Sequence, residues 1–367
     1  MKTKTMENDA KINSTFKKYI VILLAAGLAL AVICAALVVI VDPFFHYHAP
    51  LAGFPYEVDN QLSQNPGMAK HMDYDAVVLG SSMTVNFDTN VFKEETGLDT
   101  IKLPYSGAYP KDISNIMSII FEAHPDVDTV FLGVDVINYS SDADEIKFPL
   151  PEYLYDDNLV NDINYLLNKD VLLNYVIKPM VSPDPTDLSK VYASWWTDEY
   201  YNINYVMPNY MREYEPLDPR PEELPKEYFE EQICVNMEEN IIPYIEAHPD
   251  TRFVIFYPPY SILFWNDCRN LNKTEATLYE YEVISRMLLD YDNTEIFFFA
   301  DEEEIITDLN NYADYTHYHP RYNDYMTRCF ADGTDRAHDM DEVMAHIDHM
   351  RKIATSYDYE ELLGRGW

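Results

Sequence analysis

The sequence predicts an α/β protein with a doubly wound parallel sheet, preceded by one membrane-spanning helix and interrupted by an insertion in the middle of the chain. Short continuous apolar runs recur along the chain, and amphipathic segments of helical period separate them. Such runs are typical of strands buried on both faces, and strands that alternate with helices indicate a parallel sheet covered on both sides. The N-terminal region differs, because residues 19–41 contain no charged side chain.

These uncharged residues are predicted to form a transmembrane helix. As a helix the 23 residues span roughly 34 Å, enough to cross a bilayer core of about 30 Å. A cleavable signal peptide has a shorter apolar core of about 7–15 residues, so we expect this helix to be retained as an anchor. Cys34 raises the alternative of a lipoprotein cleavage site, which is disfavoured because Cys34 lies in mid-helix and the preceding Ile33 is not small.

The charges on either side of the helix predict its orientation. Residues 1–18 contain five lysines and two acidic residues, a net charge of +3, and such positive flanks stay in the cytoplasm. We therefore expect a cytoplasmic N-terminus and an exported bulk, held at a cell membrane by a single span. The whole chain carries −37, so residues 19–367 carry −40, which argues against DNA or RNA partners. We attribute this charge to solubility outside the cell rather than to a cationic substrate.

The cysteines of the exported part do not form a disulfide pattern. Cys234, Cys268 and Cys329 are odd in number and have no C-x-x-C spacing. We therefore expect at most one incidental pair, which favours a bacterial surface protein over a small secreted disulfide-rich domain.

Beyond the helix, residues 42–73 are predicted to be a juxtamembrane connector, and residues 74–367 the extracytoplasmic domain. The connector begins with aromatic side chains, which favour a membrane interface. The predicted strands lie at residues 74–80, 100–103, 129–134, 252–257 and 295–299. The predicted helices lie before Gly97 and at residues 110–124, 227–248 and 273–290. Five such strands fit a flavodoxin-like sheet, whose functional crevice lies at the carboxyl ends of the strands.

The insertion covers about residues 138–224. It is rich in Tyr, Asp, Asn and Pro and has only weak helical patterns. It is interpreted either as a lid or substrate-binding cap over the strand ends or as an ordinary surface excursion, and both interpretations remain open.

Two short motifs carry the candidate chemistry. Gly80-Ser81-Ser82-Met83 follows the first strand, and Asp314-Tyr315-Thr316-His317 follows the last. In a doubly wound sheet both motifs fall at the same edge, where a serine could give its proton to a histidine oriented by an aspartate. Each motif alone is weak, since a Gly-Ser turn is often only a helix cap.

Together these motifs resemble those of the SGNH (GDSL-like) hydrolase superfamily. The resemblance implies that Ser82 is the nucleophile and that Asp314 and His317 complete a triad. It also implies an oxyanion hole formed by the backbone N–H groups of Ser82 and Gly107, with Gly107 in Leu103-Pro104-Tyr105-Ser106-Gly107 after the second strand. The resemblance covers roughly residues 74–137 and 250–330.

The chain departs from the family pattern at two places. Ser81 replaces the usual aspartate of the first motif, which leaves Ser81 as an alternative nucleophile. The third family motif appears only as Gly133-Val134-Asp135-Val136, without its asparagine. One oxyanion donor is therefore missing or comes from elsewhere, such as Asn138, and loss of one donor lowers the rate by about 100–1000-fold.

Other polar and aromatic residues are less specific. No metal site and no cofactor are expected, because no further Cys or His cluster joins His317, His319 and Asp314. His346 and His349 are interpreted as a solvated helix face. Tyr257 and Tyr260 follow the fourth strand and are expected to line the crevice and contact substrate. A sugar-stacking surface is the alternative use of the 31 tyrosines, most of which we assign to packing.

These expectations lead to a serine esterase or O-acyltransferase outside the membrane. The anchored layout resembles bacterial proteins that work with membrane-bound O-acyltransferases, such as the D-alanyl transfer protein of teichoic-acid modification and the alginate O-acetylation proteins. This implies the membrane, such an acyltransferase, and an envelope polysaccharide or lipid-linked substrate as partners. The alternatives are a plain hydrolase of small esters and a non-catalytic scaffold or carbohydrate-binding subunit on a degenerate SGNH fold.

Overall fold

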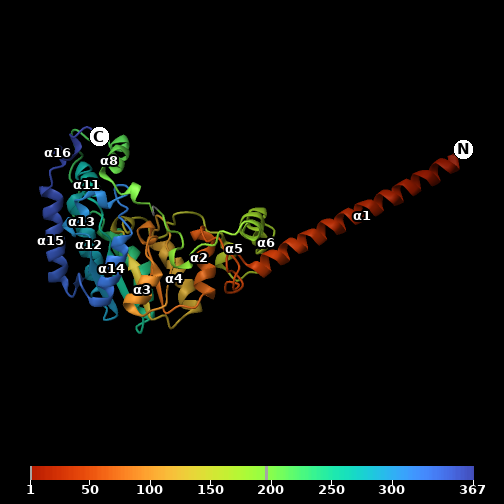
Figure 1. The fold of residues 1–367 in the computed structure, drawn as a ribbon, viewed down its shortest axis with the longest axis horizontal. Coiled ribbons are helices and arrows are strands. Elements are labelled where there is room, and N and C mark those ends of the chain that lie inside the picture. The colour runs from red at the N-terminus through yellow and green to blue at the C-terminus, as the bar shows by residue number, and fades with distance from the viewer. Residues whose placement is uncertain (1, 195–196) are drawn as a thin grey trace.

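A long N-terminal helix projects from an α/β body in the computed structural model (Figure 1), which describes residues 2–194 and 197–367 and the side chains from Thr15 onward. Helix α1 comprises Lys2–Val41. Its part from Thr15 to Val41 is long and apolar enough to cross a membrane. The C-terminus lies at the end of the body remote from α1. The prediction of one N-terminal apolar helix is confirmed.

The body contains a mostly parallel sheet, as predicted. Within the described ranges it has six strands in the order β2-β1-β3-β4-β5-β6, with β6 antiparallel to β5 and the other neighbours parallel. The strands are β1 (Ala76–Leu79), β2 (Thr100–Lys102), β3 (Thr129–Gly133), β4 (Arg252–Tyr257), β5 (Thr294–Phe298) and β6 (Arg336–Ala337). All residues of β1 and β3 are buried, which explains their continuous apolar runs. Strand β6 was not predicted, because two residues carry no periodic signal.

Helices cover the sheet and fill the connections. After α1 the described α-helices are α2 (Gln61–His71), α3 (Thr89–Thr96), α4 (Pro110–Ala123), α5 (Glu152–Tyr155), α6 (Ile163–Leu166), α7 (Lys178–Val181), α8 (Ile203–Glu213), α9 (Glu230–Asn236), α10 (Ile242–Ala247), α11 (Ile262–Asn270), α12 (Thr274–Leu288), α13 (Glu303–Ile306), α14 (Arg321–Asp332), α15 (Met340–Ser356) and α16 (Tyr359–Leu363). The short 3₁₀ turns are η1 (Ser82–Thr84), η2 (Val136–Asn138), η4 (Leu188–Lys190), η5 (Asp198–Tyr200) and η7 (Leu309–Asn311), and the π turns are η3 (Val171–Ile177) and η6 (Met237–Ile241).

Aromatic side chains join α3 and α14 to the sheet. Phe330 of α14 lies 5.3 Å from Phe131 of β3 and 5.2 Å from Phe256 of β4, measured between ring centroids. Phe92 of α3 lies 4.8 Å from Phe131. This buried cluster fixes the position of α3, the helix that follows β1 and η1.

The single helix predicted at residues 227–248 is divided. It consists of α9, the π turn η6 and α10. Pro243 lies in the first turn of α10 and has no N–H to donate, so the regular helical hydrogen bonds are interrupted there.

Residues 42–73 are not an open connector, which corrects the sequence-based interpretation. Helix α2 lies in this segment and packs against α4, with its central residues buried. Two of the buried residues are polar, but Gln64 donates to the carbonyls of Pro43 and Glu57, and Asn65 donates to Pro104. The polar composition predicted a connector because these hydrogen bonds cannot be seen in the sequence.

Glu280 in α12 gives the body an expected pH dependence. Its side chain is buried, and one carboxyl oxygen has no hydrogen-bond partner. Burial raises the pKa of Glu280 from 4.5 to about 8, although Lys273 acts in the opposite direction. The folded chain therefore keeps this proton between pH 4.5 and pH 8 while the unfolded chain loses it, so stability falls as pH rises through this window.

Replacing Glu280 by Gln should remove this dependence. We expect the free energy of unfolding of the Glu280→Gln variant, relative to the unmodified chain, to rise by a few kcal/mol between pH 5 and pH 8. Urea denaturation in detergent at both pH values measures it. A difference that does not change with pH would contradict the buried, protonated state of Glu280.

Candidate active site

The structure brings Ser82, His317 and Asp314 into one line of contacts. The Oγ atom of Ser82 lies 2.8 Å from Nε2 of His317. The Nδ1 atom of His317 lies 2.6 Å from Oδ2 of Asp314. Because a carboxylate can only accept, His317 carries its proton on Nδ1, and its Nε2 can then accept the Ser82 proton. Ser82 follows β1 and the other two follow β5, both at the carboxyl edge of the sheet.

The loop around Asp314 holds its carboxylate in place. Oδ1 of Asp314 accepts hydrogen bonds from the backbone N–H groups of Thr316 and His317, each at 2.8 Å. Burial acts to raise the pKa of Asp314, but the hydrogen bonds and charge of His317 outweigh it and hold the pKa below its usual range. A bridge between Tyr312 and Tyr318 closes the loop. Asp314 is thus ionised and oriented toward His317.

The turn at Ser82 is shaped by close backbone contacts. Gly80 has a φ of +144°, and a Cβ atom there would lie 2.7 Å from the Thr84 side chain. Glycine is therefore required for the chain to leave β1 at this angle. The hydroxyl of Tyr318 donates to the carbonyl of Met83 at 2.9 Å, which links the serine turn to the histidine loop.

Ser81 and Ser82 have different environments. Ser81 is 5 % exposed, its Oγ accepts the N–H of Met83 at 3.2 Å, and its hydroxyl is hydrogen-bonded to Asp135. Ser82 is half-buried and contacts His317. Of the two predicted nucleophiles, only Ser82 faces the base.

Asp135 is a site residue whose role the sequence did not reveal. It follows β3, is buried, and accepts hydrogen bonds from Ser81 and from the hydroxyl of Tyr260. Burial raises its pKa, and these two partners together with His317 oppose the shift. In the SGNH resemblance, Asp135 stands at the position where an asparagine is expected. Its position at the carboxyl end of a strand was the available signal, but its buried partners come from other segments.

Lys102 hydrogen-bonds to the segment that directly follows the serine turn. Its Nζ donates to the carbonyls of Val85 at 2.5 Å and of Phe87 at 2.7 Å. Burial lowers the pKa of Lys102 to about 7, and the nearby Asp88 acts in the opposite direction. The sequence showed Lys102 only as part of a strand.

The predicted oxyanion donors have free N–H groups. Within the described chain, neither Ser82 nor Gly107 donates a backbone hydrogen bond. Gly107 has a φ of +74°, and no hydrogen bond joins it to the triad. Asn138 donates one of its two amide N–H groups to the carbonyl of Ala108 at 2.9 Å. Asn138 thereby supports the loop of Gly107.

Tyr257 and Tyr260 do not line an open crevice, which corrects the prediction. Tyr257 is buried between Tyr281 and Phe298, and its hydroxyl lies 2.8 Å from Oγ of Ser285. Tyr260 is buried and holds Asp135, as described above. Following a strand does not determine on which side a side chain points, and here both point into the protein.

A cavity of about 470 Å³ adjoins the site. It is bordered by Asp314 and Tyr315 on one side and by Tyr210, Tyr214 and Glu213 of the insertion on the other. Helix α8 of the insertion therefore lies beside the Asp314 side of the site. This position favours the cap interpretation of the insertion over a surface excursion.

Three other histidines considered in the sequence, His319, His346 and His349, lie close to carboxylates. His319 lies 3.3 Å from Asp198. His346 and His349 both contact the buried Asp301, and His346 stacks on Phe298. His346 is therefore packed against the body, which corrects the expectation of a solvated face for this residue, whereas His349 is exposed as expected. Among the described residues, no group of three or more His, Cys, Asp or Glu side chains could hold a metal ion.

Comparison with known proteins adds no template for this arrangement. No family model, curated protein or solved structure matches this chain. The resemblance to SGNH hydrolases therefore depends on the motif residues, and the chemistry of the site depends on the contacts described above.

Proposed function

We propose that this chain is an SGNH-type serine esterase or O-acyltransferase. The observation that carries the proposal is the line of contacts from Ser82 through His317 to the ionised Asp314. The strand order also supports it, because β2-β1-β3-β4-β5 is the order of flavodoxin-like sheets, in which sites lie at the carboxyl ends of the strands.

The reaction follows from this geometry. Ser82 Oγ attacks the acyl carbonyl carbon of an ester while its proton moves to His317 Nε2. The negative oxygen that forms is stabilised by the N–H groups of Ser82 and Gly107. The tetrahedral intermediate then expels the alcohol, which takes the proton from His317 and leaves the acyl group on Ser82. Water or a sugar hydroxyl next attacks the acyl carbon and gives its proton to His317, which passes that proton to Ser82 Oγ as the acyl–Ser82 bond breaks.

The membrane helix supports the proposed location. With α1 across a cell membrane and residues 1–18 in the cytoplasm, the site faces the outside of the cell. An envelope glycopolymer or a lipid-linked ester is the substrate class that a tethered enzyme of this kind reaches, and a membrane-bound O-acyltransferase is the proposed partner.

A fluorophosphonate probe tests the serine nucleophile. We expect the full chain in detergent to be labelled, the Ser81→Ala variant to keep its labelling and the Ser82→Ala variant to lose it. Circular dichroism and thermal unfolding show whether each variant is folded. Absence of labelling in the folded, unmodified chain would remove the enzyme proposal, and labelling lost only in Ser81→Ala would assign the other serine.

A non-catalytic scaffold or carbohydrate-binding subunit is the second candidate. The observation that favours it is Asp135, an acceptor when ionised, in the place where the family has a donor. Binding of envelope oligosaccharides by an unlabelled, folded chain would support the scaffold. For a labelled chain, release of the acyl group to water or its transfer to a sugar hydroxyl separates hydrolase from transferase.

A further inference from the structure

One segment of the insertion leaves its large apolar side chains in solvent. Outside α1, the five most exposed in the described chain all lie in residues 159–181. Val160 is 83 % exposed, Val181 77 % and Leu159 75 %. The set, here called the apolar surface, consists of Leu159, Val160, Ile163, Leu167, Leu173, Met180 and Val181. Exposed apolar residues gathered in one segment mark an interaction site.

Two elements within residues 159–181 pack against the end of α1, and α7, which carries Met180 and Val181, packs against one of them. Helix α6 and the π turn η3 both contact α1, and Figure 1 shows α6 beside the point where α1 meets the body. On α1 the buried and half-buried side chains are concentrated between Cys34, which is half-buried, and Val41, which is buried. These eight residues extend about 12 Å along the helix axis.

This contact lies at the outer boundary of a bilayer. The 27 residues from Thr15 to Val41 extend about 40 Å, which exceeds a hydrocarbon core of about 30 Å. The last turns of α1 and the elements packed on them therefore fall at the interface of lipid tails and headgroups.

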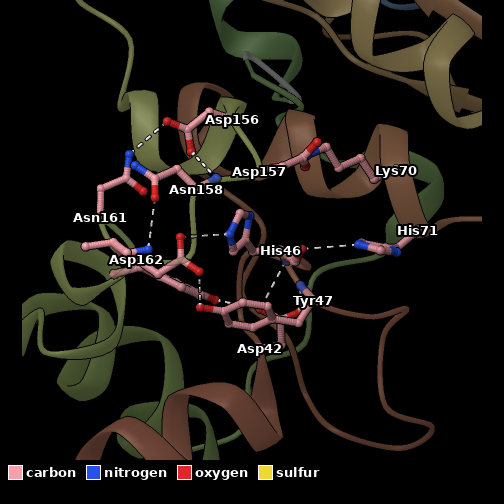
Figure 2. A network of polar contacts seen from close by, with 12 residues as sticks. Asp42, His46, Tyr47, Lys70, His71, Asp156, Asp157, Asn158, Asn161 and Asp162 are labelled. Atoms are coloured by element: carbon pink, nitrogen blue, oxygen red, sulfur yellow. Dashed lines mark hydrogen bonds and ion pairs between the residues drawn. The ribbon is translucent and has the colours of Figure 1, made fainter.

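A buried polar network keeps α6 in this position. The carboxylate of Asp42, the residue after α1, accepts hydrogen bonds from the hydroxyl of Tyr165 in α6 at 2.9 Å and from the N–H of Tyr47 at 2.6 Å. The Tyr47 hydroxyl in turn donates to Asp162 at 2.9 Å, and His46 lies 3.4 Å from Asp162 (Figure 2). The insertion is thus joined to the chain where the membrane helix ends.

The charge of this segment is compatible with a membrane surface. Residues 159–181 contain two lysines and two aspartates, in a chain whose net charge is −37. Asp162 is buried in the network, and Lys178 pairs with Glu57 at 2.7 Å. The segment therefore lacks the excess negative charge that anionic headgroups would repel.

We propose that the apolar surface inserts into the outer leaflet beside α1 and binds its acyl chains. It is an interfacial element of short helices, which lie in the plane of the membrane and bury apolar side chains by about 5–10 Å. The proposal rests on the membrane span of α1 and not on catalysis.

Depth-dependent fluorescence quenching tests this proposal. Single cysteines replace Val160 or Val181 in a full chain whose half-exposed Cys34 and Cys234 are changed to Ala and Ser, and an environment-sensitive dye labels them. In phosphatidylethanolamine–phosphatidylglycerol vesicles we expect blue-shifted emission and at least a two-fold loss of intensity with nitroxide-labelled lipid. Leu271→Cys is the matched control, because Leu271 is 44 % exposed and follows α11 at the other end of the body (Figure 1).

The outcomes separate the alternatives. Quenching at both positions 160 and 181 but not at 271 supports the proposal. Quenching no stronger than at 271, in chains that float with the vesicles, overturns it. Cross-linking of these positions to another protein in native membranes, without quenching in pure lipid, would assign the surface to a protein partner instead. Flotation shows whether α1 anchors the chain in the vesicles. Labelling by the fluorophosphonate in the same vesicles shows whether Ser82 is reactive, so a failure of anchoring and a failure of the proposed function are recognised separately.

Discussion

Replacing His317 by Ala is expected to lower kcat/KM for a small activated ester, such as p-nitrophenyl acetate, by on the order of 10⁴–10⁶-fold. Nε2 of His317 is the acceptor 2.8 Å from Ser82 Oγ, and without it the serine hydroxyl has no base at neutral pH. Because the two side chains act in one step, the effects should not add. The Ser82→Ala, His317→Ala and double variants should have similar residual rates.

His319 supplies the matched control. It is two residues away but points to Asp198 on the surface and stacks near Tyr201. The His319→Ala variant should therefore keep its rate within a few-fold of the unmodified chain. Steady-state hydrolysis, after thermal unfolding has shown that all variants are folded, provides the measurement. A double variant much slower than either single variant would show that Ser82 and His317 do not act together.

Replacing Asp42 by Ala is expected to lower the free energy of unfolding by about 1–3 kcal/mol. Asp42 is fully buried, and its carboxylate accepts hydrogen bonds from the N–H groups of His46, Tyr47 and His48 and from the hydroxyl of Tyr165. Its removal leaves the buried Tyr165 hydroxyl and three half-buried N–H groups without their acceptor, and an unsatisfied donor costs more than the hydrogen bond itself contributed.

Asp157 lies beside the same network (Figure 2) and serves as the control for Asp42. Its side chain is 85 % exposed and pairs with Lys70 at 3.3 Å. An exposed ion pair of this kind contributes less than about 1 kcal/mol, so Asp157→Ala should change stability little. Urea denaturation of the full chain in detergent, followed by tyrosine and tryptophan signals, compares them. Equal losses for the two variants would contradict the structural role of Asp42.

The sequence was informative where a residue's position along the chain determines its position in space. A buried parallel strand has a recognisable composition, and the residue after it must lie at the carboxyl edge, so Ser82 and His317 could be placed together. The same reasoning could not determine side-chain direction. Tyr257 ends β4 and Tyr260 follows it, close to the same sheet edge as Ser82, but both point into the core.

Other features depend on partners that are distant in the sequence. Gln64 and Asn65 suggested a solvated connector because their backbone acceptors are brought near only by folding. The sequence showed Asp135 only as a replacement for an asparagine. Its hydrogen-bond partners Tyr260 and Ser81 are brought near it only by folding. The apolar surface could not be predicted, because a weak helical pattern does not show whether its apolar side chains are buried against the body or exposed.

With α1 across a membrane, the junction at Asp42 would hold the body at one distance from the lipid. A catalytic domain on a flexible linker samples a wide volume above the membrane, so its effective concentration at any one height is low. Here no flexible linker separates α1 from the body. The N–H of Asp42 still donates to the carbonyl of Val38, and the residues that follow are already packed. In a bilayer such a molecule diffuses laterally, while its body stays at a fixed height above the lipid. Substrate groups at the same distance from the lipid as Ser82 would encounter Ser82 often. Substrate groups nearer to the lipid or farther from it would have to bend to reach Ser82.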